Sequence, residues 1–136
     1  TGFGIAANYT IVQGDVGFHD DGNPSVDQFA LTGLSDTANA VFMYEKYGWS
    51  ARLAYNWRDK YLILANQGGS RNPYYVESYA QWDLSVNYQF NEHLSVGLEG
   101  INLLGEDVRW HARTNAQVIK LADQSPRYML GVRYKF

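Results

Sequence analysis

The chain has 136 residues, 46% of them hydrophobic and 15% aromatic, and a formal net charge of −3 at pH 7. This length suits one domain, and the acidic balance argues against nucleic acid, which calls for a basic surface. The mean hydropathy of −0.37 and the lack of a long apolar run exclude a transmembrane helix. The absence of cysteine excludes disulfides and thiol chemistry.

Six segments alternate apolar and polar residues with a period of two, which predicts β-strands with one apolar and one polar face. The fourth is the clearest, since Trp82, Leu84 and Val86 alternate with polar residues. The fifth loses its phase around Gly100–Gly105, which predicts a bulge or kink. In chain order we expect strands over about Phe3–Val12, Ala38–Lys46, Trp49–Arg58, Trp82–Phe90, a segment that begins at Leu94, and Tyr128–Phe136.

The connections between these segments alternate between short and long. Tyr47-Gly48 and Asn91–His93 are short, whereas the links over about 13–37, 64–81 and 113–126 are long and polar. Barrels of the bacterial outer membrane have tight periplasmic turns and long extracellular loops. The pattern therefore predicts such a barrel, with the short turns and Phe136 on the periplasmic side. Aromatic residues near the same strand ends, among them Tyr134, would form its periplasmic girdle.

Alternation alone does not identify the solvent, because a soluble antiparallel sheet with one buried face shows the same pattern. A soluble β-sandwich that binds carbohydrate through its aromatic residues therefore stays open as an alternative. So does a small or truncated barrel that acts as a structural or partner-binding module of the outer membrane. Six strands are too few to close alone, since single-chain barrels start at about eight. We therefore expect part of a larger barrel, or pairing with another chain.

The sequence offers little support for catalysis or for a bound metal. His19, His93 and His111 lie in separate segments, and no nucleophile stands at a recognised spacing. We predict that the chain is not an enzyme and holds no cofactor. The loop His19–Asp27 carries several oxygen ligands, but its spacing does not fit the EF-hand pattern for calcium. A solvated turn is the preferred interpretation of this loop.

Aromatic and basic residues gather in two of the long connections. Aromatic faces stack on sugar rings or flat chelates, and arginine binds carboxylates or catecholates. The candidate ligand contacts are therefore Tyr74, Tyr75, Arg109, Trp110, His111 and Arg113. Alternatively, Trp110 and the tyrosines form an outer-leaflet girdle while the arginines meet lipopolysaccharide phosphates. Other charged residues, with Asp83 and Glu99 as counter-charges, are expected to line a wet lumen: Arg52, Arg58, Arg127, Arg133 and Lys135.

Several segments resemble the late strands of TonB-dependent outer-membrane transporters, most closely the branch common in Xanthomonas- and Caulobacter-type bacteria. The resemblance covers nearly the whole chain and rests on Thr32–Glu45, Gly48–Arg58, Gly100–Asp107 and Pro126–Phe136. It implies an all-β fold, the last six strands of an antiparallel transmembrane barrel of about 22 strands. It also implies that residues 1–136 are the C-terminal part of that barrel, without the plug and the earlier strands.

Members of that family import scarce nutrients such as iron-siderophores, haem, cobalamin and, in this branch, oligosaccharides. The resemblance implies such a receptor in the bacterial outer membrane, with this chain as barrel wall and part of the substrate vestibule. The implied partners are outer-membrane lipid and lipopolysaccharide, the remaining strands and plug, the TonB complex and the barrel-assembly machinery, but no nucleic acid. Tyr134 and Phe136 would be the signal that this machinery recognises.

Overall fold

The computed structural model describes residues 2–13, 18–19, 22–23, 25, 28, 30–65 and 72–136. Among these residues no helix is long and apolar enough to cross a membrane. The regular elements are strands: β1 Phe3–Thr10, β2 Thr37–Lys46, β3 Trp49–Arg58, β4 Tyr61–Leu64, β5 Tyr74–Val76, β6 Tyr79–Gln89, β7 Leu94–Ile101, β8 Val108–His111, β9 Val118–Ala122 and β10 Arg127–Tyr134.

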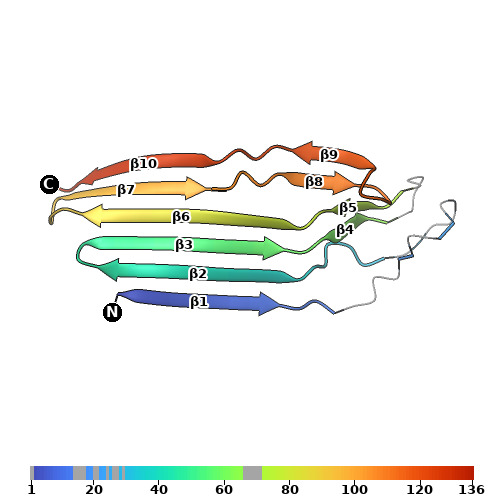
Figure 1. The fold of residues 1–136 in the computed structure, drawn as a ribbon, viewed down its shortest axis with the longest axis horizontal. Coiled ribbons are helices and arrows are strands. Elements are labelled where there is room, and N and C mark those ends of the chain that lie inside the picture. The colour runs from blue at the N-terminus through green and yellow to red at the C-terminus, as the bar shows by residue number, and fades with distance from the viewer. Residues whose placement is uncertain are drawn as a thin grey trace.

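Six long strands form one antiparallel sheet in the order β1-β2-β3-β6-β7-β10 (Figure 1). These are the six strands that the sequence predicts. The β2–β3 turn consists of Tyr47 and Gly48, whose φ angles of 55° and 80° match the twist of a two-residue hairpin. Both short turns lie at one end of the sheet and the long connections at the other (Figure 1), so the predicted alternation of connections is confirmed.

A second, four-stranded sheet in the order β4-β5-β8-β9 extends the first beyond the end with the long connections (Figure 1). The β4–β5 ladder begins in the register of β3–β6, because Tyr61 follows Arg58 by three residues and its partner Val76 precedes Tyr79 by three; the register shifts after Leu62. The β3–β6 hairpin therefore resumes as β4–β5. The sequence predicts only loops here, because strands of three to five residues show too few alternations to be recognised.

Between β7 and β8 the chain carries two residues more than the neighbouring strand. Gly100 and Trp110 are ten residues apart, whereas their partners Leu84 and Val76 are eight apart. The surplus lies within the segment for which the loss of phase predicts a bulge or kink, so that prediction is confirmed. Side chains keep their faces across this junction because the surplus is an even number.

Asn102 holds this bulge in place. Its φ of 53° is left-handed, a conformation that asparagine tolerates better than most residues. The side chain is 4% exposed. Its amide accepts a hydrogen bond from Glu106 N and donates to the carbonyls of Glu106 and Gln124. The buried amide therefore has hydrogen-bond partners in two segments, the one before β8 and the one before β10.

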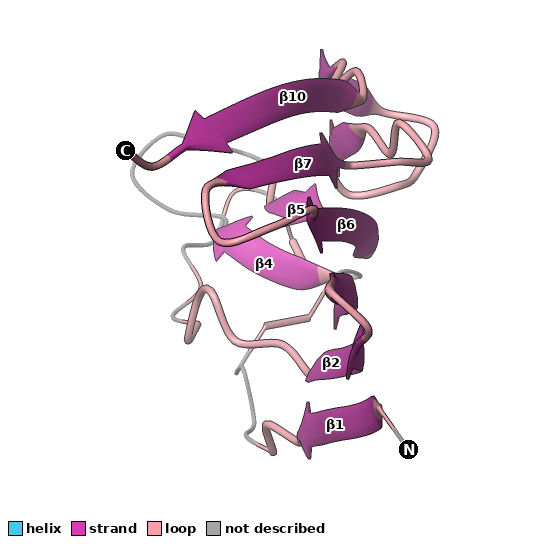
Figure 2. Cartoon of the chain, turned by 90° about the vertical axis from the view of Figure 1, so that its left-hand side faces the viewer, coloured by secondary structure: helices cyan, strands magenta, loops and turns pink. Residues whose placement is uncertain are grey.

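The six-stranded sheet has one apolar face and one face that is mostly polar, although the row Ala6, Val41 and Ala54 interrupts the polar face. Leu53 pairs in register with Leu84 on the apolar face, and Arg52 pairs with Ser85 on the polar face. Figure 2 shows the strands nearly end-on, stacked in order from β1 to β10. The apolar face is not covered by other elements of the described chain. Ala54 of β3 is buried, and the other buried hydrophobic residues belong to the four-stranded sheet or its flanks: Leu62, Ala65, Val76 and Ala112.

Candidate functional site: a two-faced wall and its outer extension

A band of aromatic rings follows the apolar face at the end with the short turns. Phe3 and Tyr44 have ring centroids 4.8 Å apart, and those of Trp49 and Tyr88 are 4.6 Å apart. Tyr134 contacts Phe136 at 5.2 Å. This is the girdle that the sequence predicts at the periplasmic end.

A second aromatic band, called the upper aromatic band below, crosses the same face near the long connections. The rings of Tyr9 and Trp57 stack at 6.4 Å, and those of Tyr55 and Trp82 lie 4.7 Å apart. Tyr128, 63% exposed, lies on this face as well. The outer-leaflet girdle considered from the sequence consists of Trp110 and the tyrosines of the long connections and does not include these residues. Alternation nevertheless places Tyr9, Trp57 and Trp82 on apolar faces near the ends of their strands.

The spacing of the two bands matches the apolar layer of an outer membrane. Trp49 and Trp57 are eight residues apart on β3, which corresponds to roughly 26 Å along a strand. A strand tilt of about 40° reduces that to a height of about 20 Å, close to the apolar band of a membrane barrel. On β3 the residues between the bands are small or aliphatic on this face, Ala51 and Leu53, and Leu53 pairs with Phe42 of β2. This face is built to meet hydrocarbon.

A sheet with a polar inner face and a banded apolar outer face defines the wall of a membrane-spanning β-barrel. The family model described as "TonB dependent receptor-like, beta-barrel" matches residues 2–103, which include β1 to β7. The chain belongs to this family, whose members are outer-membrane transport receptors, so its place is the bacterial outer membrane. No curated protein and no solved structure matches the chain.

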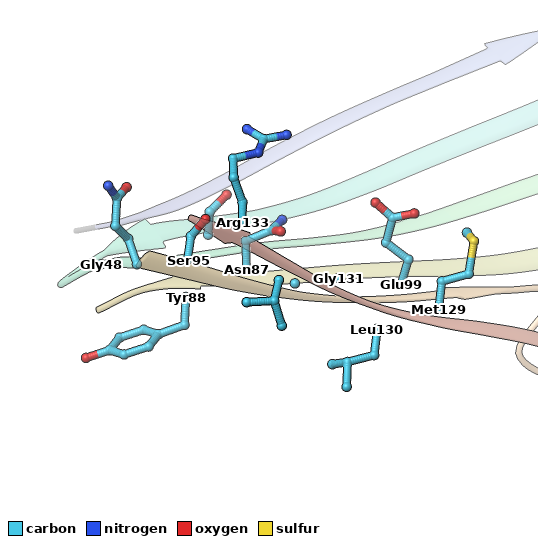
Figure 3. Close-up of a pocket in the computed structure, with 13 residues that line it drawn as sticks. Gly48, Asn87, Tyr88, Ser95, Glu99, Met129, Leu130, Gly131 and Arg133 are labelled. Carbon is cyan, nitrogen blue, oxygen red and sulfur yellow. The ribbon is translucent and has the colours of Figure 1, made fainter. Parts of the chain in front are cut away.

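A hollow of about 720 Å³ opens on the polar face near the short turns. Gly97 and Gly131, which pair in register, supply no side chains to its floor; the Asn87 carboxamide lies over Gly97, and the space over Gly131 is open. Figure 3 shows Arg133 and Glu99 on one side of the strands and Leu130 on the other. The polar and apolar faces therefore alternate here as the sequence predicts.

A row of four carboxamides crosses the polar face at the level of the upper aromatic band. Asn8, Asn39, Asn56 and Gln81 are successive register partners on β1, β2, β3 and β6. Asn39 Nδ2 donates to Asn8 Oδ1 at 2.9 Å. The row could not be foreseen from the sequence, because it depends on the register of three ladders. It borders a hollow of about 400 Å³, whose lining includes Thr37, Asn39, Asn56, Arg58, Tyr79 and Gln81.

The charged residues of the polar face are not joined in ion pairs. Asp83 accepts hydrogen bonds from Gln81 Nε2 at 2.7 and 3.0 Å and from Asn102 N at 3.0 Å. Among the described residues the cations predicted to line the lumen reach no carboxylate within ion-pair distance. Asp83 and Glu99 therefore offset the positive charge of these cations at a distance, without direct ion pairs. The cations concerned are Arg52, Arg58, Arg127, Arg133 and Lys135.

Two of the predicted ligand contacts, Tyr75 and His111, lie together inside the four-stranded sheet. They are register partners on β5 and β8, and their rings stack at 5.2 Å. His111 is 1% exposed. Its Nδ1 lies 2.6 Å from the Ala112 carbonyl, which can only accept, so Nδ1 carries the proton. Its Nε2 faces Glu77 Oε1 at 3.6 Å.

The other four predicted contacts are not brought to this pair. Trp110 lies on the opposite face of β8, with Lys120 Nζ 4.9 Å from its ring. Arg109 Nη2 donates to the Asn115 carbonyl at 2.7 Å. Tyr74 on β5 and Arg113 beyond β8 are half-buried. Residues 109–111 form a strand, in which neighbouring side chains point to opposite faces, so they do not form one cluster.

The loop considered for calcium, His19–Asp27, is largely outside the described residues, since Asp20, Asp21, Pro24, Val26 and Asp27 are not among them. In the part of the chain that the structure describes, no three histidine or acidic side chains are grouped as metal ligands.

Proposed function

We propose that this chain forms part of the wall of a receptor that takes up a scarce nutrient, an oligosaccharide or an iron-siderophore, across the outer membrane. The four-stranded sheet then forms part of the extracellular vestibule. The observation that carries this proposal is the apolar face bounded by two aromatic bands, Trp49 and Tyr88 in one, Trp57 and Trp82 in the other. The role of the chain is transport and not catalysis.

The remaining barrel strands and the plug are partners in this proposal. The edge strands β1 and β10 each pair with one neighbour among the described residues. An open edge in a bilayer leaves backbone groups unpaired at several kcal/mol each, so further strands must close the wall. The glycine-floored hollow near the short turns would face the plug, through which the TonB complex supplies energy. Lipopolysaccharide would surround the upper aromatic band.

We keep the six residues predicted from the sequence as candidate contacts with the nutrient, and we assign them two different roles. Trp110, Arg109 and Arg113 lie on or beside the β8–β9 hairpin, where loops of a receptor meet their ligand. Tyr75 and His111 pack inside the sheet and would hold this hairpin in position. Tyr74, which precedes Tyr75 on β5, stays in the set as a predicted contact.

Membrane insertion tests the proposal directly. The protein, expressed from its whole gene in a Gram-negative host, should fractionate with the outer membrane and require detergent for extraction. It should also migrate faster on a gel before heating than after, as folded barrels do. A protein that remains folded and monomeric in detergent-free buffer would contradict the membrane assignment.

A further inference from the structure

The upper hollow of the polar face has the chemistry of a binding site for hydroxyl groups. Carboxamides offer both donors and acceptors without charge, and three of them, Asn39, Asn56 and Gln81, border it side by side. Asn56 is exposed, and its side chain makes no hydrogen bond within the described residues. The two groups of its amide are therefore available to a ligand.

The neighbours of this amide row fix its orientation. Tyr79 O–H lies 2.9 Å from Gln81 Oε1 and 3.2 Å from Gln124 Oε1. The Gln81 amide donates in turn to Asp83 at 2.7 Å. Asn39 is tied to Asn8. The donors and acceptors around Asn56 are thus held in place before a ligand arrives, which lowers the entropic cost of binding.

The charges near the hollow disfavour an anion. Asp83, Glu106 and Asp107 lie close enough to Tyr79 to act on it electrostatically. The single cation in the lining, Arg58, holds its guanidinium 4.3 Å from the centre of the Tyr61 ring. Three carboxylates therefore stand against one guanidinium around this hollow, a balance that repels a carboxylate or catecholate ligand. An uncharged ligand is not subject to this repulsion.

We propose that the hollow bordered by Asn39, Asn56 and Gln81 is a subsite for one residue of a neutral oligosaccharide. Sugar hydroxyls both donate and accept, as the amides do, and the volume of about 400 Å³ suits a small ring system. The row stands at the level of the upper aromatic band, toward the end that carries the long connections, so a ligand entering from outside reaches it early. This inference rests on the proposed receptor function and chooses between its two nutrient classes.

Binding to the membrane-inserted protein tests the subsite. The probes are an array of neutral oligosaccharides (glucans, xylans and galactans) and, for comparison, a ferric tris-catecholate chelate. We expect at least one oligosaccharide to bind and Asn56→Ala to weaken that binding about tenfold, the effect of losing one or two hydrogen bonds. Asn87→Ala, an exposed amide of the same face near the other end, is the matched control and should change binding less than twofold.

Each other outcome overturns a distinct claim. Binding of the chelate but of no oligosaccharide, or equal binding by the Asn56→Ala and Asn87→Ala proteins, overturns the subsite and leaves the receptor function standing. Failure of the unmutated protein to insert into the outer membrane overturns the receptor function and the subsite with it. Heat-modifiable migration of both variants shows that a loss of binding does not come from a loss of fold.

Discussion

Asn102 shows how much a single residue contributes at the junction of the two sheets. Its amide makes three hydrogen bonds from a position that is 4% exposed, and its backbone is left-handed. These are separate contributions. Removal of the amide deprives the backbone groups of Glu106 and Gln124 of these part-buried hydrogen bonds. A β-carbon without the amide, as in alanine, makes the left-handed backbone less favourable.

The two contributions can be separated by two substitutions. Asn102→Gly keeps the backbone conformation and should lower the unfolding free energy by about 1–3 kcal/mol through the lost hydrogen bonds. Asn102→Ala should cost about 1 kcal/mol more, because alanine resists the left-handed region. Denaturant titration of the protein folded in detergent or lipid measures both. Asn115→Ala, in the exposed β8–β9 turn, is the control, and equal stability of the alanine and glycine variants at Asn102 would contradict the backbone argument.

At the scale of the strand, the face to which a side chain points determines how much stability is lost when a charge is introduced there. Leu84 and Ser85 are neighbours on β6, and the register places Leu84 between Leu53 and Gly100 on the apolar face. Leu84→Arg should lower stability by about 2–4 kcal/mol, since this face meets the bilayer near its middle. Ser85→Arg should cost less than about 1 kcal/mol, because it points into a wet lumen. Equal costs in the same denaturant titration would refute the assignment of the faces.

The β8–β9 hairpin depends on His111 for its position on the four-stranded sheet. Removal of the imidazole takes away the Tyr75 stack and the bond to the Ala112 carbonyl. His111→Ala should therefore speed amide hydrogen exchange at residues 112–118 by at least about tenfold, while exchange in β3 and β6 stays unchanged. Thr114→Ala, exposed in the same turn, is the control. Unchanged exchange in the hairpin of His111→Ala would show that the stack does not hold it.

The sequence predicts the long strands but not the short ones, because only a long strand shows enough alternating residues to be recognised. Eight to eleven residues of alternation identify β1 and β6, and their facing follows. The strands β5 and β8 have three and four residues, too few to distinguish from a loop. The candidate site shares this limit: Arg109, Trp110 and His111 look like a cluster until β8 is known to be extended. The amide row needs the register itself, which no single segment encodes.

At the scale of the whole molecule, the end of β10 concerns assembly more than stability. Phe136 is fully exposed and contacts only Tyr134 among the ring pairs of this end. Deletion of Phe136 should slow the appearance of the heat-modifiable form in cells at least severalfold, with little change in the denaturation midpoint of protein that has folded. Phe90→Ala, an exposed aromatic at the same end, is the control. Normal insertion kinetics without Phe136 would remove its proposed role.

The two-residue surplus between β7 and β8 restricts how this region can change in length. One residue added or removed between Gly100 and Trp110 would exchange the faces of Trp110 and His111 relative to Val76 and Tyr75. The tryptophan would then enter the packed side, and the histidine would leave it. A change of two residues would keep every side chain on its face and alter only the size of the bulge. Insertions or deletions of an even number of residues at this junction therefore leave the two faces of the four-stranded sheet unchanged, whereas an odd number exchanges them.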